Sequence, residues 1–173
     1  DWDREAVPQK RYDGCFVGNL NDANRANHLD KLFKAIPNFY WGCQRFHEAA
    51  EKFNQSRIVF NVSARSELNM RHFEALGAGA FLLTDNIPQD QNVFKHGVHF
   101  VGYENLEDMV HKAKYYLDHA EERVRIADAG HAEALARHTY AHRVMTVLDT
   151  IGIPYEKSKA DAILPKAVEP CLI

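Results

Sequence analysis

The sequence has few cysteines, no long apolar run and little net charge. Its three cysteines, Cys15, Cys43 and Cys171, are far apart and show no paired spacing. This argues against a disulfide framework or a structural zinc site and favours a reducing compartment. No run of about 18 apolar residues occurs, so no membrane-spanning segment is predicted, and residues 1–5 are too polar for a signal peptide. We therefore expect a cytoplasmic protein.

Several common functional signals are missing as well. With 21 basic and 24 acidic side chains, a formal net charge of −3 and no basic stripe, a nucleic-acid partner is not expected. The sequence lacks a G-x-G-x-x-G dinucleotide fingerprint, a G-x-S-x-G elbow and a P-loop, which argues against nicotinamide enzymes, common hydrolases and P-loop ATPases. His138 and His142 are four residues apart but do not form a His-Glu-x-x-His motif. We predict no metal site and expect most histidines to be solvated.

The sequence contains enough hydrophobic residues to form the core of one domain. It has 173 residues, of which 46% are hydrophobic. Strand-like and helix-like patterns alternate over the first two thirds of the chain, which predicts βαβ units, a parallel sheet and trailing helices. Residues 1–11 are interpreted as a lead-in, residues 12–153 as the domain and residues 154–173 as an extended tail. Strands are expected at residues 12–17, 39–41, 57–62, 80–84 and 98–101, and helices at residues 26–36, 48–54, 69–77, 106–117, 121–138 and 140–151.

The loops that follow the strands are the expected ligand site, because ligands bind outside the carboxyl ends of parallel strands. The richest loop, residues 63–74, is polar and opens into a helix whose backbone amides could bind a phosphate, with Arg65 or Arg71 adding charge. One turn into that helix, Glu74 could reach sugar hydroxyls. A solvated surface role for Glu74 is an equal alternative, although its neighbours are apolar and a buried carboxylate would need strong partners.

Two loops from the first half of the chain could add to this site. Gly18 and Asn19 follow the first strand, and Arg25 at the start of the next helix could meet a phosphate. An Asn-rich helix cap with a surface arginine is the simpler interpretation of this stretch. The aromatic segment that follows the second expected strand could form one wall of a base-binding slot, or could belong to the core. Its candidate base neighbours are Trp41, Gly42, Arg45 and Phe46.

A fourth loop follows the most apolar strand. There Thr84 and Asp85 would direct a hydroxyl and a carboxylate toward the ligand crevice, although an aspartate at this position could equally cap a turn.

Residues 61–85, with residues 69–85 at the centre, resemble the signature of group 1 glycosyltransferases, especially the spore-maturation-protein-B-like branch. Residues 16–19 with Arg25 resemble the first strand and loop of that family. Residues 94–97, 103–106 and 138–143 resemble its later strand and helices, so the resemblance covers roughly residues 12–150.

The resemblance implies the C-terminal, donor-binding domain of the GT-B architecture, with a Rossmann-like parallel sheet flanked by helices. It implies binding of a UDP- or GDP-linked sugar, no required cofactor, and an N-terminal Rossmann-like acceptor domain as partner. Glu74 corresponds to the second glutamate of the family's Glu-x7-Glu motif, which holds the ribose. Ser66 stands where the first glutamate is expected, and Glu67 lies one position off. The diphosphate would be held by the turn of Ser66, Glu67, Leu68, Asn69, Met70 and Arg71, with Arg25.

A second hypothesis is a non-catalytic nucleotide-binding or assembly module derived from the same fold, and Ser66 favours it. A phosphoacceptor receiver domain would share the strand and helix alternation. That class requires clustered acidic residues and a lysine at the strand ends, and Asp85 alone does not meet this requirement. The sequence assigns no catalytic residue.

Overall fold

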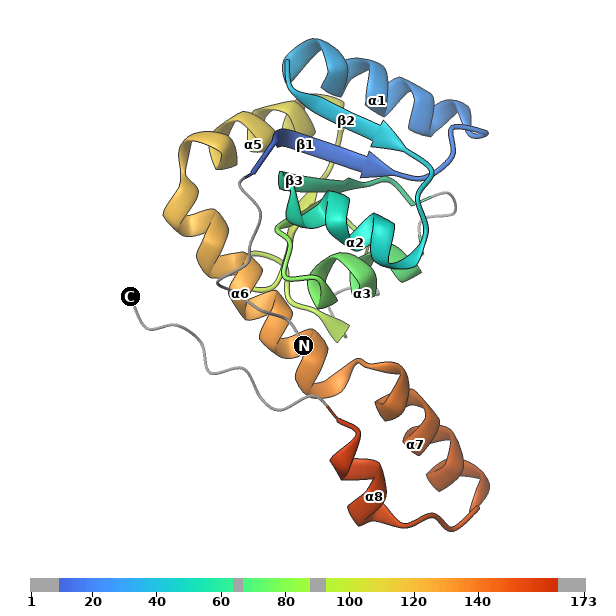
Figure 1. The fold of residues 1–173 in the computed structure, drawn as a ribbon. Helices are drawn as coiled ribbons and strands as arrows, with labels where there is room; N and C mark the ends of the chain where they lie inside the picture. The colour runs from blue at the N-terminus through green and yellow to red at the C-terminus, as the bar shows by residue number, and fades with distance from the viewer. Residues whose placement is uncertain (1–9, 64–66, 88–92, 165–173) are drawn as a thin grey trace.

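A five-stranded parallel sheet forms the centre of the structure, a computed structural model that describes residues 10–63, 67–87 and 93–164 (Figure 1). Its strand order is β2-β1-β3-β4-β5, and every neighbouring pair is parallel. Helices flank the sheet, so the predicted Rossmann-like α/β fold is confirmed. The strands are β1 (Tyr12–Val17), β2 (Phe39–Gly42), β3 (Ser56–Asn61), β4 (Leu82–Asp85) and β5 (Val101–Tyr103).

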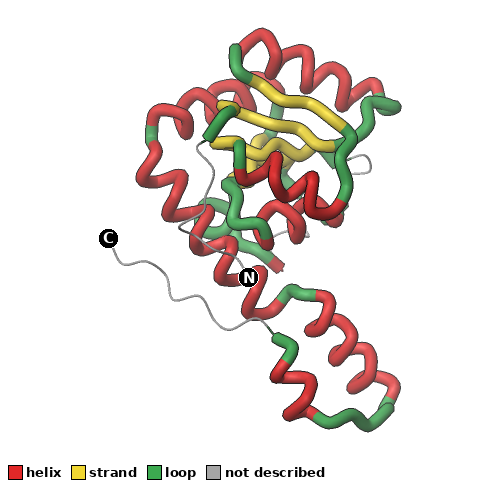
Figure 2. The backbone as a smooth tube through the Cα atoms, in the orientation of Figure 1, coloured by secondary structure: helices red, strands yellow, loops and turns green. Residues whose placement is uncertain are grey.

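Helices on both faces of the sheet enclose two apolar cores (Figure 2). Successive strand residues point to opposite faces, so Ile58 and Phe60 join one core while Val59 joins the other. The first core packs against α1 and α5, and the second against α2 and α3, while α6 contributes to both. The helices are α1 (Ala23–Ala35), α2 (Phe46–Asn54), α3 (Met70–Gly77), α5 (Leu106–Asp118), α6 (Ala120–Arg137), α7 (Tyr140–Ile151) and α8 (Lys157–Ala162).

The last two strands begin later than predicted. The expected strand at residues 98–101 is replaced by a turn followed by β5, because Gly97 adopts a left-handed backbone conformation that reverses the chain. Its φ is 74°, and its amide donates to the Phe100 carbonyl at 2.8 Å. The turn leaves Val98 exposed, so the apolar run that predicted this strand is only partly buried.

Helix α3, which carries most of the predicted site, ends as the sequence indicates. Gly79 has a φ of 71° and its amide donates to the Leu76 carbonyl at 2.9 Å, while the Ala80 amide donates to the Ala75 carbonyl at 3.0 Å. These two bonds form a Schellman motif, which requires the left-handed backbone that glycine adopts without strain. The motif turns the chain directly from α3 toward β4.

The C-terminal helices extend away from the sheet (Figure 1). No residue of α7 is buried, and its apolar residues Tyr140, Val144, Val147 and Ile151 are exposed. Helix α8 lies within the segment after Pro154 that was expected to be extended, so that expectation is wrong for these residues. None of the helices described is both long enough and apolar enough to cross a membrane.

Candidate functional site

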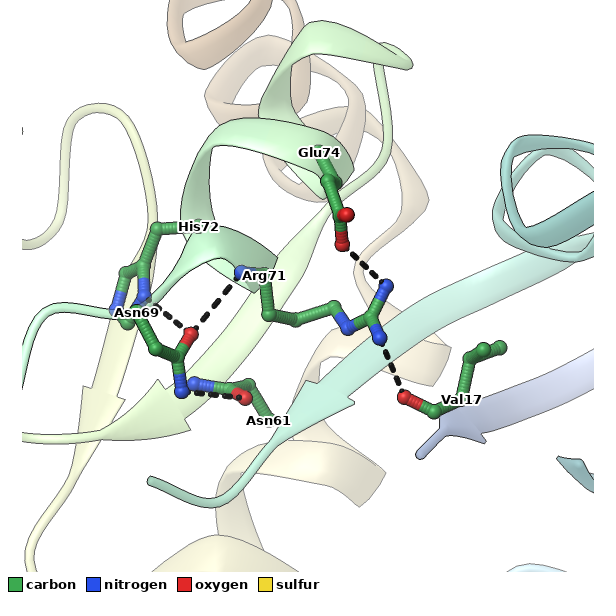
Figure 3. Close-up of polar contacts among 6 residues, drawn as sticks. All are labelled: Val17, Asn61, Asn69, Arg71, His72 and Glu74. Carbon is green, nitrogen blue, oxygen red and sulfur yellow. Dashed lines mark hydrogen bonds and ion pairs between the residues drawn. The ribbon is translucent and has the colours of Figure 1, made fainter. Parts of the chain in front are cut away.

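The carboxyl edge of the sheet brings together most of the predicted site residues. Arg71 lies in the first turn of α3 and reaches across this edge to β1. Its Nη2 donates to the Val17 carbonyl at 2.7 Å, and its Nη1 contacts Glu74 Oε2 at 2.7 Å (Figure 3). Burial lowers the pKa of Arg71, and the Glu74 carboxylate opposes that shift. A largely buried cation is thus held at the sheet edge by a carbonyl and a carboxylate.

Asn69 fixes the beginning of α3 and therefore the direction of Arg71. Its Oδ1 accepts from the Arg71 amide at 3.1 Å and lies 3.2 Å from His72 Nδ1, as Figure 3 shows. An asparagine at this position satisfies an amide that the helix leaves without an internal partner. This N-cap was not singled out by sequence reasoning, which considered Asn69 only as a source of backbone amides.

Glu74 is exposed, although its neighbours in the sequence are apolar. Its side chain is 43% exposed, compared with 18% for Arg71. Helical geometry explains the difference, because Ala75 and Leu76 face the core while Glu74 lies on the outer face of α3. The carboxylate is therefore solvated and ion-paired rather than buried, and it is accessible to a ligand.

A chain of polar side chains joins α3 to the ends of β3 and β4. Asn69 Nδ2 donates to Asn61 Oδ1 at 3.3 Å, and Asn61 Nδ2 donates to Thr84 Oγ1 at 3.0 Å. Thr84 Oγ1 donates in turn to Asp85 Oδ1 at 3.1 Å. Thr84 is fully buried, and its hydroxyl is hydrogen-bonded to Asn61 within the sheet. The expectation that this hydroxyl faces the ligand crevice is therefore wrong.

Asp85 ties β4 to the loop after β3. Its Oδ1 accepts from the Ser63 amide at 2.9 Å and its Oδ2 accepts from the Ser63 hydroxyl. The adjacent Tyr103 hydroxyl donates to the Asn61 carbonyl at 2.9 Å, and burial, with Asp85 nearby, raises the Tyr103 pKa well above its usual value. Asp85 thus holds the loop after β3 against the end of β4, as the turn-capping alternative predicted. Sequence reasoning placed Ser63 in the richest candidate loop but assigned no individual role to Ser63 or to Asn61.

Arg25 lies at the start of α1 and faces the loop after β3. Its Nε donates to the Val62 carbonyl at 3.0 Å, and its Nη1 donates to Asn19 Oδ1 at 3.5 Å. The Asp22 side chain caps α1 by accepting from the Arg25 amide at 3.0 Å. The cap is therefore Asp22 and not one of the asparagines of the predicted Asn-rich cap, and Arg25 lies between the loops that follow β1 and β3.

Trp41 lies beside the loop after β1. Its indole Nε1 donates to the Gly18 carbonyl at 2.9 Å, and the Gly18 amide donates to the Gly42 carbonyl at 2.8 Å. Trp41 is 43% exposed, so it is not a core residue. Arg45 is exposed, and the backbone of Phe46 begins α2.

The remaining predicted residues form the turn that leads into α3. Glu67 and Met70 are exposed and Leu68 is half-buried. Ser66, like Arg65, lies outside the described residues.

A cavity of about 230 Å³ opens beside Glu74, between α3 and the junction of α6 and α7. Phe73 and Glu74 line it from α3, and His138, Tyr140 and Arg143 line it from the other side. The Arg143 guanidinium lies 5.8 Å from the centre of the Phe73 ring. Burial, together with Arg143, lowers the pKa of His138. Sequence reasoning did not predict this cavity, and the only signal was the resemblance of residues 138–143.

Most of the histidines are exposed or half-buried, in line with expectation, but His72 and His131 are buried. The His131 ring contacts the Leu76 carbonyl at 3.0 Å and so links α6 to α3. Within residues 10–63, 67–87 and 93–164, no three His, Cys, Asp or Glu side chains gather as a possible metal site.

Comparison with known proteins supports the fold and the broad family that the sequence resembles. No curated protein matches the chain. A family described as glycosyl transferase-like matches residues 24–149, which is most of the chain and runs from the first turn of α1 into the last turn of α7. The chain therefore belongs to the glycosyl transferase-like family.

Proposed function

We propose that this chain is the donor-binding half of a glycosyltransferase of the GT-B architecture, in the spore-maturation-protein-B-like branch. Its substrate would be a UDP- or GDP-linked sugar, from which a hexosyl group passes to an acceptor. The observation that supports this best is the pairing of Arg71 with the exposed Glu74 at the N-terminus of α3. A cation, the backbone amides of the turn that leads into a helix and an accessible carboxylate are what a diphosphate joined to a ribose requires.

In this proposal each group has a separate role. Glu74 accepts hydrogen bonds from the ribose hydroxyls, while Arg71, Arg25 and the amides of residues 66–70 bind the diphosphate. Negative charge accumulates on the diphosphate as its bond to the sugar breaks. Fixed amide dipoles, the helix N-terminus and arginine stabilise that charge without having to reorient. No cofactor is required by these roles.

The nucleotide base would lie beside Trp41. Its indole is exposed, and its hydrogen bond to the Gly18 carbonyl holds it next to the loop that follows β1. An aromatic face provides a stacking surface for a base, and Gly18 allows close approach of a ligand to the backbone. Gly42, Arg45 and Phe46 are the further candidate neighbours.

The acceptor would be bound by a second, N-terminal Rossmann-like domain. This chain would then bind the donor by itself and transfer the sugar only together with that partner. A cytoplasmic location suits a donor made as a nucleotide sugar. The free cysteines among the described residues, buried Cys15 and exposed Cys43, are compatible with a reducing compartment.

Nuclear magnetic resonance of the chain titrated with UDP and GDP tests this proposal. We expect saturable amide shifts at Gly18, Trp41 and residues 67–74. Shifts confined to other surfaces, or none at all, would contradict it. The alternative of a non-catalytic module, which Ser66 favours, predicts the same shifts but neither hydrolysis nor transfer of the sugar when the companion domain is added.

A further inference from the structure

A second cavity, of about 250 Å³, lies at the amino-terminal edge of the sheet. Lys10 lines it from the segment before β1, Arg57 from the start of β3 and Arg123 from α6. Because all strands are parallel, this edge is opposite the edge that carries Arg71 and Glu74. Three cations from distant parts of the sequence therefore meet at a place that the proposed donor site does not use.

Polar contacts hold the side chains of Arg57 and Arg123 in place, but each guanidinium keeps N–H groups that can donate to a ligand. Arg57 Nη1 contacts Asp13 Oδ1 at 3.1 Å. Arg123 Nη1 donates to the Leu117 carbonyl at 3.3 Å and also to the Tyr116 carbonyl. In the part of the chain that the structure describes, both side chains make their polar contacts through Nη1. A guanidinium has five N–H donors, so Nε and Nη2 of each arginine are left for an additional acceptor.

The cations are close enough to repel one another. Burial lowers the pKa of Arg123, Arg57 lowers it further and Asp13 opposes the shift. Burial also lowers the pKa of Lys10, and Arg123 adds to that effect. Asp128 is the carboxylate that lines the cavity with them. A bound anion would relieve the repulsion among the three cations, because opposite charges within a few ångströms favour the charged forms.

We propose that this cavity binds a phosphoryl group, either as inorganic phosphate or as the phosphate of a small organic monoester. Arginine forks and a lysine are well suited to phosphate oxygens. A water molecule occupies about 30 Å³ of liquid, so the cavity has space for a phosphate with an attached group. The inference does not depend on the proposed donor site, because it concerns the opposite edge of the sheet.

Titration of the full chain with inorganic phosphate and with glucose 6-phosphate, followed by amide resonances, tests this proposal. We expect saturable shifts at Lys10, Arg57 and Gly79. Lys10→Gln should raise the dissociation constant by about tenfold, as for loss of a charged hydrogen bond. Its fold should be intact, because Lys10 precedes β1 and belongs to no helix or strand. Tighter binding of glucose 6-phosphate would identify a monoester, and equal binding would identify free phosphate.

Two control variants separate this site from the donor site. Lys114→Gln removes an exposed lysine of α5 and should leave the affinity unchanged. Arg71→Gln should also leave the shifts at Lys10 and Arg57 unchanged. Absence of saturable shifts at this edge, or equal affinities for Lys10→Gln and the unaltered chain, would overturn the proposal.

Discussion

Arg71 and Val17 are 54 positions apart in the sequence, yet Arg71 Nη2 donates to the Val17 carbonyl at 2.7 Å. This bond joins the first turn of α3 to the last residue of β1 at the carboxyl edge of the sheet. The same guanidinium contacts Glu74 and lies 5.0 Å from the centre of the Phe53 ring. One side chain thus sets the distance between the two loops that would enclose the diphosphate.

Replacing Arg71 with lysine should weaken both the fold and nucleotide binding. An ammonium group is a compact point charge and cannot reproduce the fork that reaches Val17 and Glu74 together. We expect the free energy of unfolding, measured by urea denaturation, to fall by about 1–2 kcal/mol. The affinity for UDP or GDP should fall about tenfold. Arg137→Lys is the matched control, since Arg137 is exposed and pairs with Glu133 on the surface. Equal effects of the two variants would refute the assigned role of Arg71.

Asp85→Ala should destabilise the protein by about 1–3 kcal/mol, because the amide and hydroxyl of Ser63 and the Thr84 hydroxyl all lose their acceptor. Asp30→Ala, at an exposed ion pair with Lys34, should cost less than about 0.5 kcal/mol. Denaturant unfolding of both variants measures the difference. If Asp85→Ala lowers the free energy of unfolding as little as Asp30→Ala does, the hydrogen bonds of Asp85 do not stabilise the loop after β3.

Two helical glycines should respond to alanine with opposite signs. A Cβ on Gly130 of α6 would lie 2.4 Å from the His99 carbonyl oxygen and 2.8 Å from Leu76, so Gly130→Ala should cost about 1–3 kcal/mol. A Cβ on Gly77 of α3 would meet nothing within 4 Å, so Gly77→Ala should stabilise by roughly 0.5 kcal/mol. Thermal unfolding provides the comparison, and a stabilising Gly130→Ala would contradict the close packing of α6 on the β4–β5 loop.

The described thiols should differ in reactivity toward iodoacetamide. Cys15 is fully buried, and burial raises its pKa to about 12, so it should not react in the folded protein. Cys43 is exposed beside Gly18, with Sγ 3.4 Å from that carbonyl, and should react. If the base binds near Trp41, saturating UDP or GDP should slow the labelling of Cys43 severalfold. Peptide mass spectrometry distinguishes the sites, and unchanged labelling would argue against a base at this position.

The order of helices and strands could be predicted because local periodicity determines it. The pattern of residues 12–17 gave the first strand with its observed ends, and residues 140–151 gave α7 in the same way. Residues 98–101 show where this signal fails, because an apolar run does not indicate that Gly97 reverses the chain just before it.

The position of the candidate site could also be predicted, since parallel strands bring their following loops to one edge. The contacts within it could not, because they join residues far apart in the sequence. Thr84 is buried by a hydrogen bond from Asn61, 23 residues away. The cavity beside Glu74 depends on how the α6–α7 junction packs against α3. No local pattern encodes such a contact.

The central claim is that the exposed carboxylate of Glu74 binds the ribose of a nucleotide sugar. Calorimetric titration of the chain with UDP, GDP, TDP and ADP and their sugar conjugates tests it most directly. We include Glu74→Ala and, as a control, Glu51→Ala at an exposed site of α2.

We predict saturable binding of UDP or GDP that Glu74→Ala weakens by more than about 1 kcal/mol, as for the loss of a charged hydrogen bond, while Glu51→Ala leaves it unchanged. The account would be contradicted if Glu74→Ala bound the nucleotide as tightly as the unaltered chain, or if the folded chain bound none of these nucleotides.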